Sequence, residues 1–133
     1  MKIYCTGCEQ DVDARLTNGA EVYPHRPDLA DYPFWHCDTC GNWVGCHHKT
    51  GTPTKPLGVI PTKKLKQWRQ VIHAQLDPMW KEGNWNRKNL YAHLNIKLGY
   101  NYNTAQIKSV DEAQKVLEAI KQLKLEVTPE RNR

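Results

Sequence analysis

Two cysteine pairs, each with two residues between its members, constrain the fold of this chain more than any other feature. They are Cys5-Thr6-Gly7-Cys8 and Cys37-Asp38-Thr39-Cys40-Gly41. A C-x2-C turn aims two thiolates at one ion, and two such turns complete a tetrahedral shell of four sulfurs. Gly41 favours this interpretation, because the turn needs a residue that tolerates positive φ just past the ligand. We therefore predict one structural Zn²⁺ held by Cys5, Cys8, Cys37 and Cys40.

The spacing leaves alternatives for the cysteines. The 28 residues between Cys8 and Cys37 exceed the roughly 15 to 20 of compact fingers, which indicates an inserted strand and loop. Reduced core cysteines or a redox pair are the other interpretations of such pairs.

A third group of metal-binding residue types follows closely, at Cys46-His47-His48. Cys46 and His47 are candidates for extra ligands, either in place of one of the four cysteines or in a second zinc site with His25 or His36. The alternative is that Cys46 is a small buried apolar group and the histidines form hydrogen bonds in the adjoining loop. A second zinc ion is therefore left open.

Strands are predicted in the first half of the chain and helices in the second. Brief aromatic or β-branched stretches predict strands at residues 2–4, 20–23, 32–36 and 43–47, in one small antiparallel sheet. Leu, Ile, Val and Phe make up only 26 of the 133 residues, so we expect a bound metal to replace part of the core.

Three amphipathic helices are predicted after the sheet. The first begins at Thr62, carries apolar residues at helical spacing and ends at Asp77-Pro78. The second starts after Asn86 and has Gly99 at its C-terminal end. The third opens with a capping box, Ser109 to Glu112.

The predicted fold class is α+β, a small antiparallel zinc-ribbon-like sheet followed by a three-helix segment. Residues 1–49 form the finger and 50–61 a loop rich in Pro, Gly and Thr. Residues 62–126 form a helical segment packed on the finger, and 127–133 a flexible tail.

Charge is distributed unevenly along the chain. Residues 1–48 carry a net charge of −4 and residues 49–133 carry +9, so attraction for phosphate belongs to the second half. Cations interleaved with flat rings suit single strands or exposed bases. The candidate nucleic-acid-binding residues are Lys63, Lys64, Lys66, Arg69, Lys81, Arg87, Lys88, Trp80 and Trp85. The alternative is an ordinary solvated helix face, with the Trp residues in the core.

One helix face carries a possible catalytic pair. Arg69, His73 and Asp77 are four residues apart and share that face. His73 would be a metal ligand or a general base oriented by Asp77. In the alternative, which we favour, Arg69 pairs with Asp77 and His73 packs between helix and finger. We therefore assign no catalytic residue and keep His73 and Asp77 as candidates.

Several short motifs point together to one family. They are Cys37-x2-Cys40, Trp43-Val44-Gly45-Cys46-His47, Gly51-Thr52, Pro56-Leu57-Gly58, Arg69-x3-His73-Ala74 and Asp77-Pro78-Met79-Trp80, with Arg87 to Gly99 as the next helix. The chain thereby resembles, over most of residues 3–120, the zinc-finger-containing domain family of bacterial and phage proteins of unknown function. The resemblance implies a zinc-bound finger fused to a helical segment in a phage or mobile-element setting. The family has a His before the Ile that precedes the last helix, whereas this chain has Gln106 before Ile107, so any role of that His is not carried over.

The sequence favours a binding module over an enzyme. Our first hypothesis is a zinc-stabilised module whose partner is nucleic acid or a protein of a nucleic-acid-processing complex. The alternatives are a protein-protein adaptor or inhibitor, and a metal-dependent nuclease using His47, His48, His73 and Asp77. Apolar runs fall far short of the roughly 20 residues that span a bilayer, and no apolar signal stretch opens the chain. We therefore expect a cytoplasmic protein of a bacterial or infected host cell, of undetermined oligomeric state.

Overall fold

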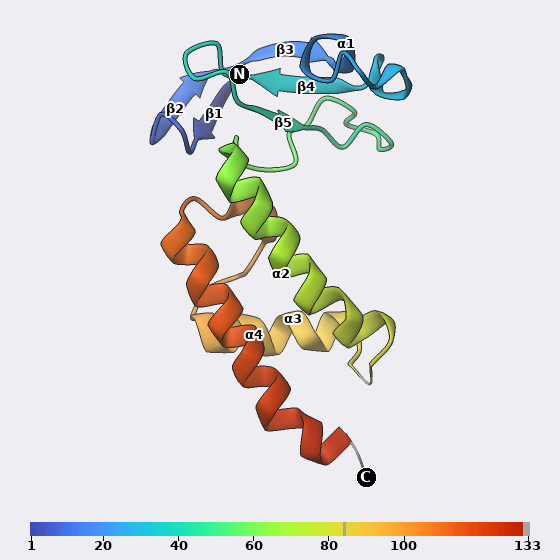
Figure 1. The fold of residues 1–133 in the computed structure, drawn as a ribbon, viewed down its shortest axis with the longest axis vertical. Helices are drawn as coiled ribbons and strands as arrows, with labels where there is room; N and C mark the ends of the chain where they lie inside the picture. The colour runs from blue at the N-terminus through green and yellow to red at the C-terminus, as the bar shows by residue number, and fades with distance from the viewer. Residues whose placement is uncertain (84, 132–133) are drawn as a thin grey trace. The chain divides into compact units, whose positions relative to one another are not determined.

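The computed structural model describes residues 1–83 and 85–131, which form two units, Met1–Lys64 and Leu65–Arg133 (Figure 1). The first unit contains two small antiparallel sheets and the second contains helices, so the α+β prediction is confirmed. Within the described residues, no helix has the length and apolar character needed to cross a membrane.

The strands of the first unit are short and pair with close neighbours. β1 (Lys2–Cys5) pairs with β2 (Gln10–Asp13), and Cys5 lies opposite Gln10. The second sheet has the order β3-β4-β5, from β3 (Arg15–Asn18), β4 (Pro33–His36) and β5 (Trp43–Gly45). The first pair of cysteines thus begins at the end of β1, and the second pair directly follows β4. The single predicted sheet is in fact two, and the sequence patterns missed β2 and β3.

The strand predicted at residues 20–23 is wrong, because these residues begin with a helical turn, α1 (Gly19–Val22). Asn18 ends β3 and its side-chain oxygen accepts a hydrogen bond from the Ala20 N–H at 3.1 Å. This bond satisfies one of the N–H groups that the start of a helix leaves unpaired. Asn-Gly therefore acts here as a helix start and not as a hairpin turn.

Gly19 allows the chain to pass close to Leu29, and this gives a first testable prediction. A Cβ at Gly19 would lie 1.8 Å from the Leu29 carbonyl oxygen, whereas a Cβ at Gly51 meets no atom within 4 Å. Gly19→Ala should lower the free energy of unfolding by about 1 to 3 kcal/mol or more. Gly51→Ala should change the free energy of unfolding by no more than about 0.5 kcal/mol. Thermal unfolding of the two variants measures the difference, and equal stabilities would refute the close approach.

The core of the first unit is small and includes two of the cysteines. Ile3, Cys5, Cys37, Val44 and Ile60 are buried together with Ala14. The segment after β5 returns to this core, because Ile60 exchanges backbone hydrogen bonds with Tyr4 and Thr6 of the β1 region. The loop predicted at residues 50–61 is therefore tied to the finger at its end.

The helical unit contains α2 (Lys63–Lys81) from Leu65 onward, together with α3 (Arg87–Leu98) and α4 (Val110–Arg131). α2 continues through Pro78, so the predicted end at Asp77-Pro78 is wrong. A proline costs a helix one main-chain hydrogen bond, and the extra turn buries Met79 in the core. α4 likewise runs beyond residue 126, where the sequence placed the start of the tail, and residues 132–133 lie outside the described range.

The predicted helix boundaries in the remainder of this unit are confirmed by their caps. Asn86 accepts hydrogen bonds from the N–H groups of Lys88 and Asn89. Gly99 ends α3 at φ 84°, in the left-handed region that favours glycine. Ser109 Oγ accepts from the Glu112 N–H at 3.1 Å, which is one half of a capping box, while the Glu112 carboxylate accepts from the Lys108 N–H at 3.3 Å.

One hydrophobic core joins the three helices, and α3 crosses the other two in Figure 1. Each helix contributes fully buried side chains, among them Ile72 and Leu76 of α2, Leu90 and Leu94 of α3, and Val116 and Ile120 of α4.

Candidate functional site

The four predicted zinc ligands come together in the first unit. Cys5 ends β1 and Cys8 lies in the turn that follows, while Cys37 and Cys40 lie in the turn after β4. Their four sulfur atoms all lie within 4.8 Å of one another. Cys5 and Cys37 are buried, and Cys40 is exposed. The site therefore has a buried side within the finger and a side that faces solvent.

The sulfur geometry fits a zinc ion. Cys5 Sγ lies 3.3 Å from Cys40 Sγ, and Cys8 Sγ lies 3.7 Å from Cys37 Sγ. A tetrahedral site with Zn–S bonds of about 2.3 Å has sulfur-sulfur edges of about 3.8 Å. These four residues would hold the ion with minor adjustment, and the shell they form is closed.

The second cysteine turn is fixed by its own backbone. The Gly41 N–H donates to the Cys37 carbonyl oxygen at 2.8 Å, with Gly41 at φ 80°. The Asn42 side-chain amide donates to Cys40 Sγ at 3.2 Å. Donors of this kind stabilise a metal-bound thiolate and orient it. The turn that the Gly41 pattern predicted is therefore present.

The thiols of the cluster differ in their affinity for protons. Burial raises the pKa of Cys5 to about 12, with a further rise from the Cys40 thiol, against N–H groups of Cys8 and Gly7 that lower it. Burial also acts to raise the pKa of Cys37, but the N–H and thiol of Cys40, with other donors, outweigh it and lower that pKa to about 7. At neutral pH the Cys5 thiolate needs a compensating cation, and Zn²⁺ supplies that charge.

The candidates for additional ligands lie outside this cluster. Among the side chains described in residues 1–83 and 85–126, the four cysteines are the sole group of three or more His, Cys, Asp or Glu that could hold a metal. Cys46 is 4% exposed, and burial raises the pKa of its thiol. The neighbouring His48 ring stacks on Tyr32, with ring centroids 4.2 Å apart. His36 pairs with Asp38, with Nδ1 2.9 Å from Oδ1.

The polar face of α2 is arranged differently from our favoured interpretation. His73 Nδ1 lies 3.4 Å from Asp77 Oδ1. Arg69 does not pair with Asp77, so that prediction is wrong. Its guanidinium donates instead to the main-chain oxygens of Ala105 at 2.9 Å and Ile107 at 3.4 Å. Arg69 therefore ties the segment before α4 to α2.

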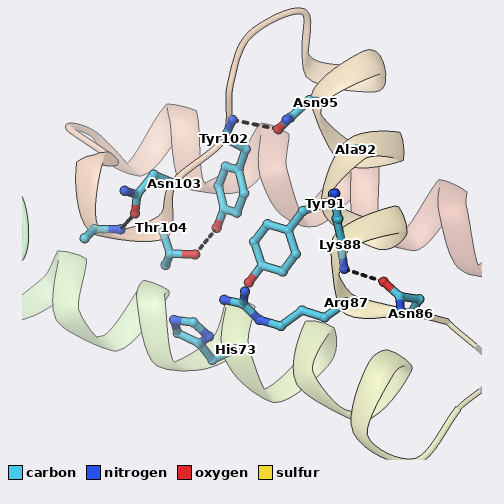
Figure 2. A pocket seen from close by; sticks show the side chains of 11 residues that line it. His73, Asn86, Arg87, Lys88, Tyr91, Ala92, Asn95, Tyr102, Asn103 and Thr104 are labelled. Atoms are coloured by element: carbon cyan, nitrogen blue, oxygen red, sulfur yellow. Dashed lines mark hydrogen bonds between the residues drawn. The ribbon is translucent and has the colours of Figure 1, made fainter.

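A pocket of about 900 Å³ opens in the helical unit beside His73 (Figure 2). α2 contributes His73, and α3 contributes Arg87, Lys88 and Tyr91. The segment that includes the 3-10 helix η2 (Thr104–Gln106) contributes Tyr102 and Thr104, among others. The lining holds cationic, aromatic and amide side chains and no carboxylate.

Aromatic rings hold the cations beside this pocket. The Arg87 guanidinium lies over two rings, 4.7 Å from the Tyr91 centroid and 5.5 Å from that of Trp80. Lys81 Nζ lies 5.3 Å from the Trp80 centroid. Such cation-π contacts restrict a long side chain while leaving its charge available. Within the described residues, neither Arg87 nor Lys81 forms an ion pair with a carboxylate.

The structure separates the predicted nucleic-acid-binding residues into two groups. Exposed cations are found at Lys63, Lys64, Lys81, Arg87 and Lys88. Arg69 and Trp85 instead contribute to the fold, since Arg69 binds main-chain oxygens and Trp85 is 9% exposed within the core.

Lys66 is a further predicted nucleic-acid-binding residue, and Tyr91 and Tyr102 are the aromatic residues of the pocket lining. Burial, with a smaller contribution from Arg69, lowers the pKa of Lys66 to about 8. Tyr91 is half-buried and packs against the core, and it also lines the pocket with Tyr102. The ten residues between these tyrosines include the end of α3, so no local pattern relates them.

The comparisons with known proteins agree with the cysteine cluster. Residues 1–125 match the model of a family described as a zinc-finger-containing domain. No curated protein and no solved structure gives a significant match. The cluster provides the metal site that this description requires, and the cofactor is a structural Zn²⁺. By this match over most of its length, the chain belongs to the zinc-finger-containing domain family.

Proposed function

We propose that this zinc-binding domain binds single-stranded nucleic acid or exposed bases through the basic, aromatic surface of its helical unit. The observation that carries the proposal is the pocket beside α2 and α3, where Arg87, Lys88 and His73 meet Tyr91 and Tyr102 without a carboxylate. Cations neutralise phosphates, and aromatic rings stack on bases. The family resemblance of the sequence supports a phage or mobile-element setting for this binding.

The zinc site has a structural role in this proposal. A closed shell of four thiolates leaves the ion without an open position for water or substrate. Four thiolates and one Zn²⁺ also sum to a charge of about −2, which repels phosphate. The cationic residues of the helical unit therefore make the contacts with nucleic acid, and the metal stabilises the finger.

Binding of a labelled single-stranded oligonucleotide should fall steeply with salt. Each phosphate contact contributes a slope of about 0.7 in the logarithm of affinity against the logarithm of salt concentration for single strands. Arg87→Ala and Lys88→Ala should each weaken binding and reduce the slope by about 0.7. Fluorescence anisotropy over a range of salt concentrations measures these effects.

Lys121→Ala is the matched control, because Lys121 is an exposed cation of α4 outside the pocket lining. It should leave both affinity and slope nearly unchanged. Absent or salt-insensitive binding would contradict the proposal. Equal losses in Lys121→Ala and Arg87→Ala would reduce the interaction to net charge alone and would also contradict it.

A further inference from the structure

The lining of the pocket at α2 and α3 offers hydrogen-bond donors in excess. The side-chain oxygens of Asn86 and Asn103 are used as caps, accepting from the N–H groups of Lys88 and Ala105. Both side chains are exposed, and within residues 1–83 and 85–126 their amide nitrogens form no hydrogen bond with another protein group. Together with Arg87 and Lys88, they make a lining that suits a ligand rich in acceptors.

The aromatic part of the lining is held in place. Tyr91 and Tyr102 lie with ring centroids 6.0 Å apart and an angle of 27° between their planes. The Tyr102 hydroxyl bonds with Thr104 Oγ1, and the Tyr102 N–H donates to the Asn95 side chain at 2.7 Å. The two rings project from different segments into the same space, with Arg87 and His73 beside them (Figure 2). This separation of centroids leaves no room for a base between the rings. Tyr102 is only 7% exposed, so a base would contact mainly the half-buried Tyr91 ring.

A neighbouring pocket differs from this one in the charge of the side chains that line it. A second pocket of about 460 Å³ shares His73 with the first, and its lining contains Lys81 together with Asp77 and Glu82. The carboxylates offset the cation and repel an anion. The larger pocket has Arg87 and Lys88 in its lining and no acidic side chain.

We propose that the larger pocket binds one phosphorylated nucleoside, with the base against Tyr91 and the amides and the phosphate on Arg87 and Lys88. Its volume of about 900 Å³ falls within the range of about 300 to 1,000 Å³ typical of small-ligand sites. The inference rests on the proposed function in so far as the nucleotide is the end of a strand or an extruded residue. A free nucleotide has the same chemistry, and the experiment distinguishes these sources.

The test is calorimetric titration of the full, zinc-loaded chain with adenosine 5′-monophosphate, adenosine and inorganic phosphate. The monophosphate should bind at least tenfold more tightly than either fragment. A thymidine oligonucleotide with a 5′-phosphate should likewise bind more tightly than the same oligonucleotide without it if strand ends are the source. Arg87→Ala should weaken binding of the monophosphate at least tenfold, and Lys121→Ala should not change it.

A pocket-filling variant separates the pocket from the charged surface. Ala92 lines the pocket and is exposed, so Ala92→Phe removes no charge and disturbs no core contact. It should abolish binding of the monophosphate. If oligonucleotides bind but the monophosphate does not, and Ala92→Phe has no effect, this inference is overturned while the proposed function stands. Binding of the monophosphate without any oligonucleotide supports the pocket and overturns nucleic-acid binding; loss of both overturns both.

Discussion

Cys37→Ser is expected to deprive the protein of its zinc and of the cooperative folding of residues 1–64. Cys37 is 1% exposed and lies in the small core with Ile3, Val44 and Ile60. Zinc binding contributes about 10 to 16 kcal/mol in finger peptides, comparable to the whole stability of an ordinary domain. Metal analysis should give one zinc per chain for the parent and less than one for the variant. Near-ultraviolet circular dichroism should show the loss of ordered aromatic residues.

Cys46→Ala provides the matched control for this experiment. Cys46 is also buried, at 4% exposure, but lies outside the four-sulfur cluster. The variant should keep one zinc per chain and unfold cooperatively, with a loss of about 1 to 2 kcal/mol from the missing buried sulfur. Loss of zinc in Cys46→Ala but not in Cys37→Ser would show that the ligand set is wrong.

Leu76→Ala is expected to destabilise the helical unit strongly. Leu76 is fully buried in the core shared by α2, α3 and α4. Truncation of a buried leucine removes apolar contacts and leaves a cavity, at a cost of about 2 to 5 kcal/mol. Urea denaturation followed by the helical signal at 222 nm should show a lower midpoint with little change in slope.

Val71→Ala tests whether this loss depends on burial. Val71 lies on the same helix and is 46% exposed. Alanine has the higher helix propensity, so the variant should stay within about 0.5 kcal/mol of the parent. Equal destabilisation by the two substitutions would contradict the described core.

Local signals in the sequence predicted the parts of the fold that depend on local chemistry. The C-x2-C turns, the Asn86 cap, Gly99 and the Ser109 capping box each act through atoms a few residues apart. The errors arose where a tertiary contact decides between local alternatives. Pro78 remains helical in a turn that buries Met79, and Gly19 follows a cap and passes close to Leu29.

The candidate nucleic-acid-binding residues were also predictable only in part. Composition placed the cations in the helical half, but it did not show which of them stabilise the fold and which stay exposed. Arg69 donates hydrogen bonds to the carbonyl groups of Ala105 and Ile107, more than thirty residues away in the chain. Trp85 is buried in the core. The pocket brings together Tyr91 and Tyr102 from segments whose relation is set by packing. No periodicity within either segment carries this information.

The most direct test of the four-cysteine zinc site is a crystal structure with diffraction data collected on both sides of the zinc absorption edge. We expect one anomalous peak per chain, at about 2.3 Å from the sulfur atoms of Cys5, Cys8, Cys37 and Cys40. The absence of a zinc peak in a folded protein would contradict it. A zinc ion bound by Cys46 or His47 would equally contradict the four-cysteine site.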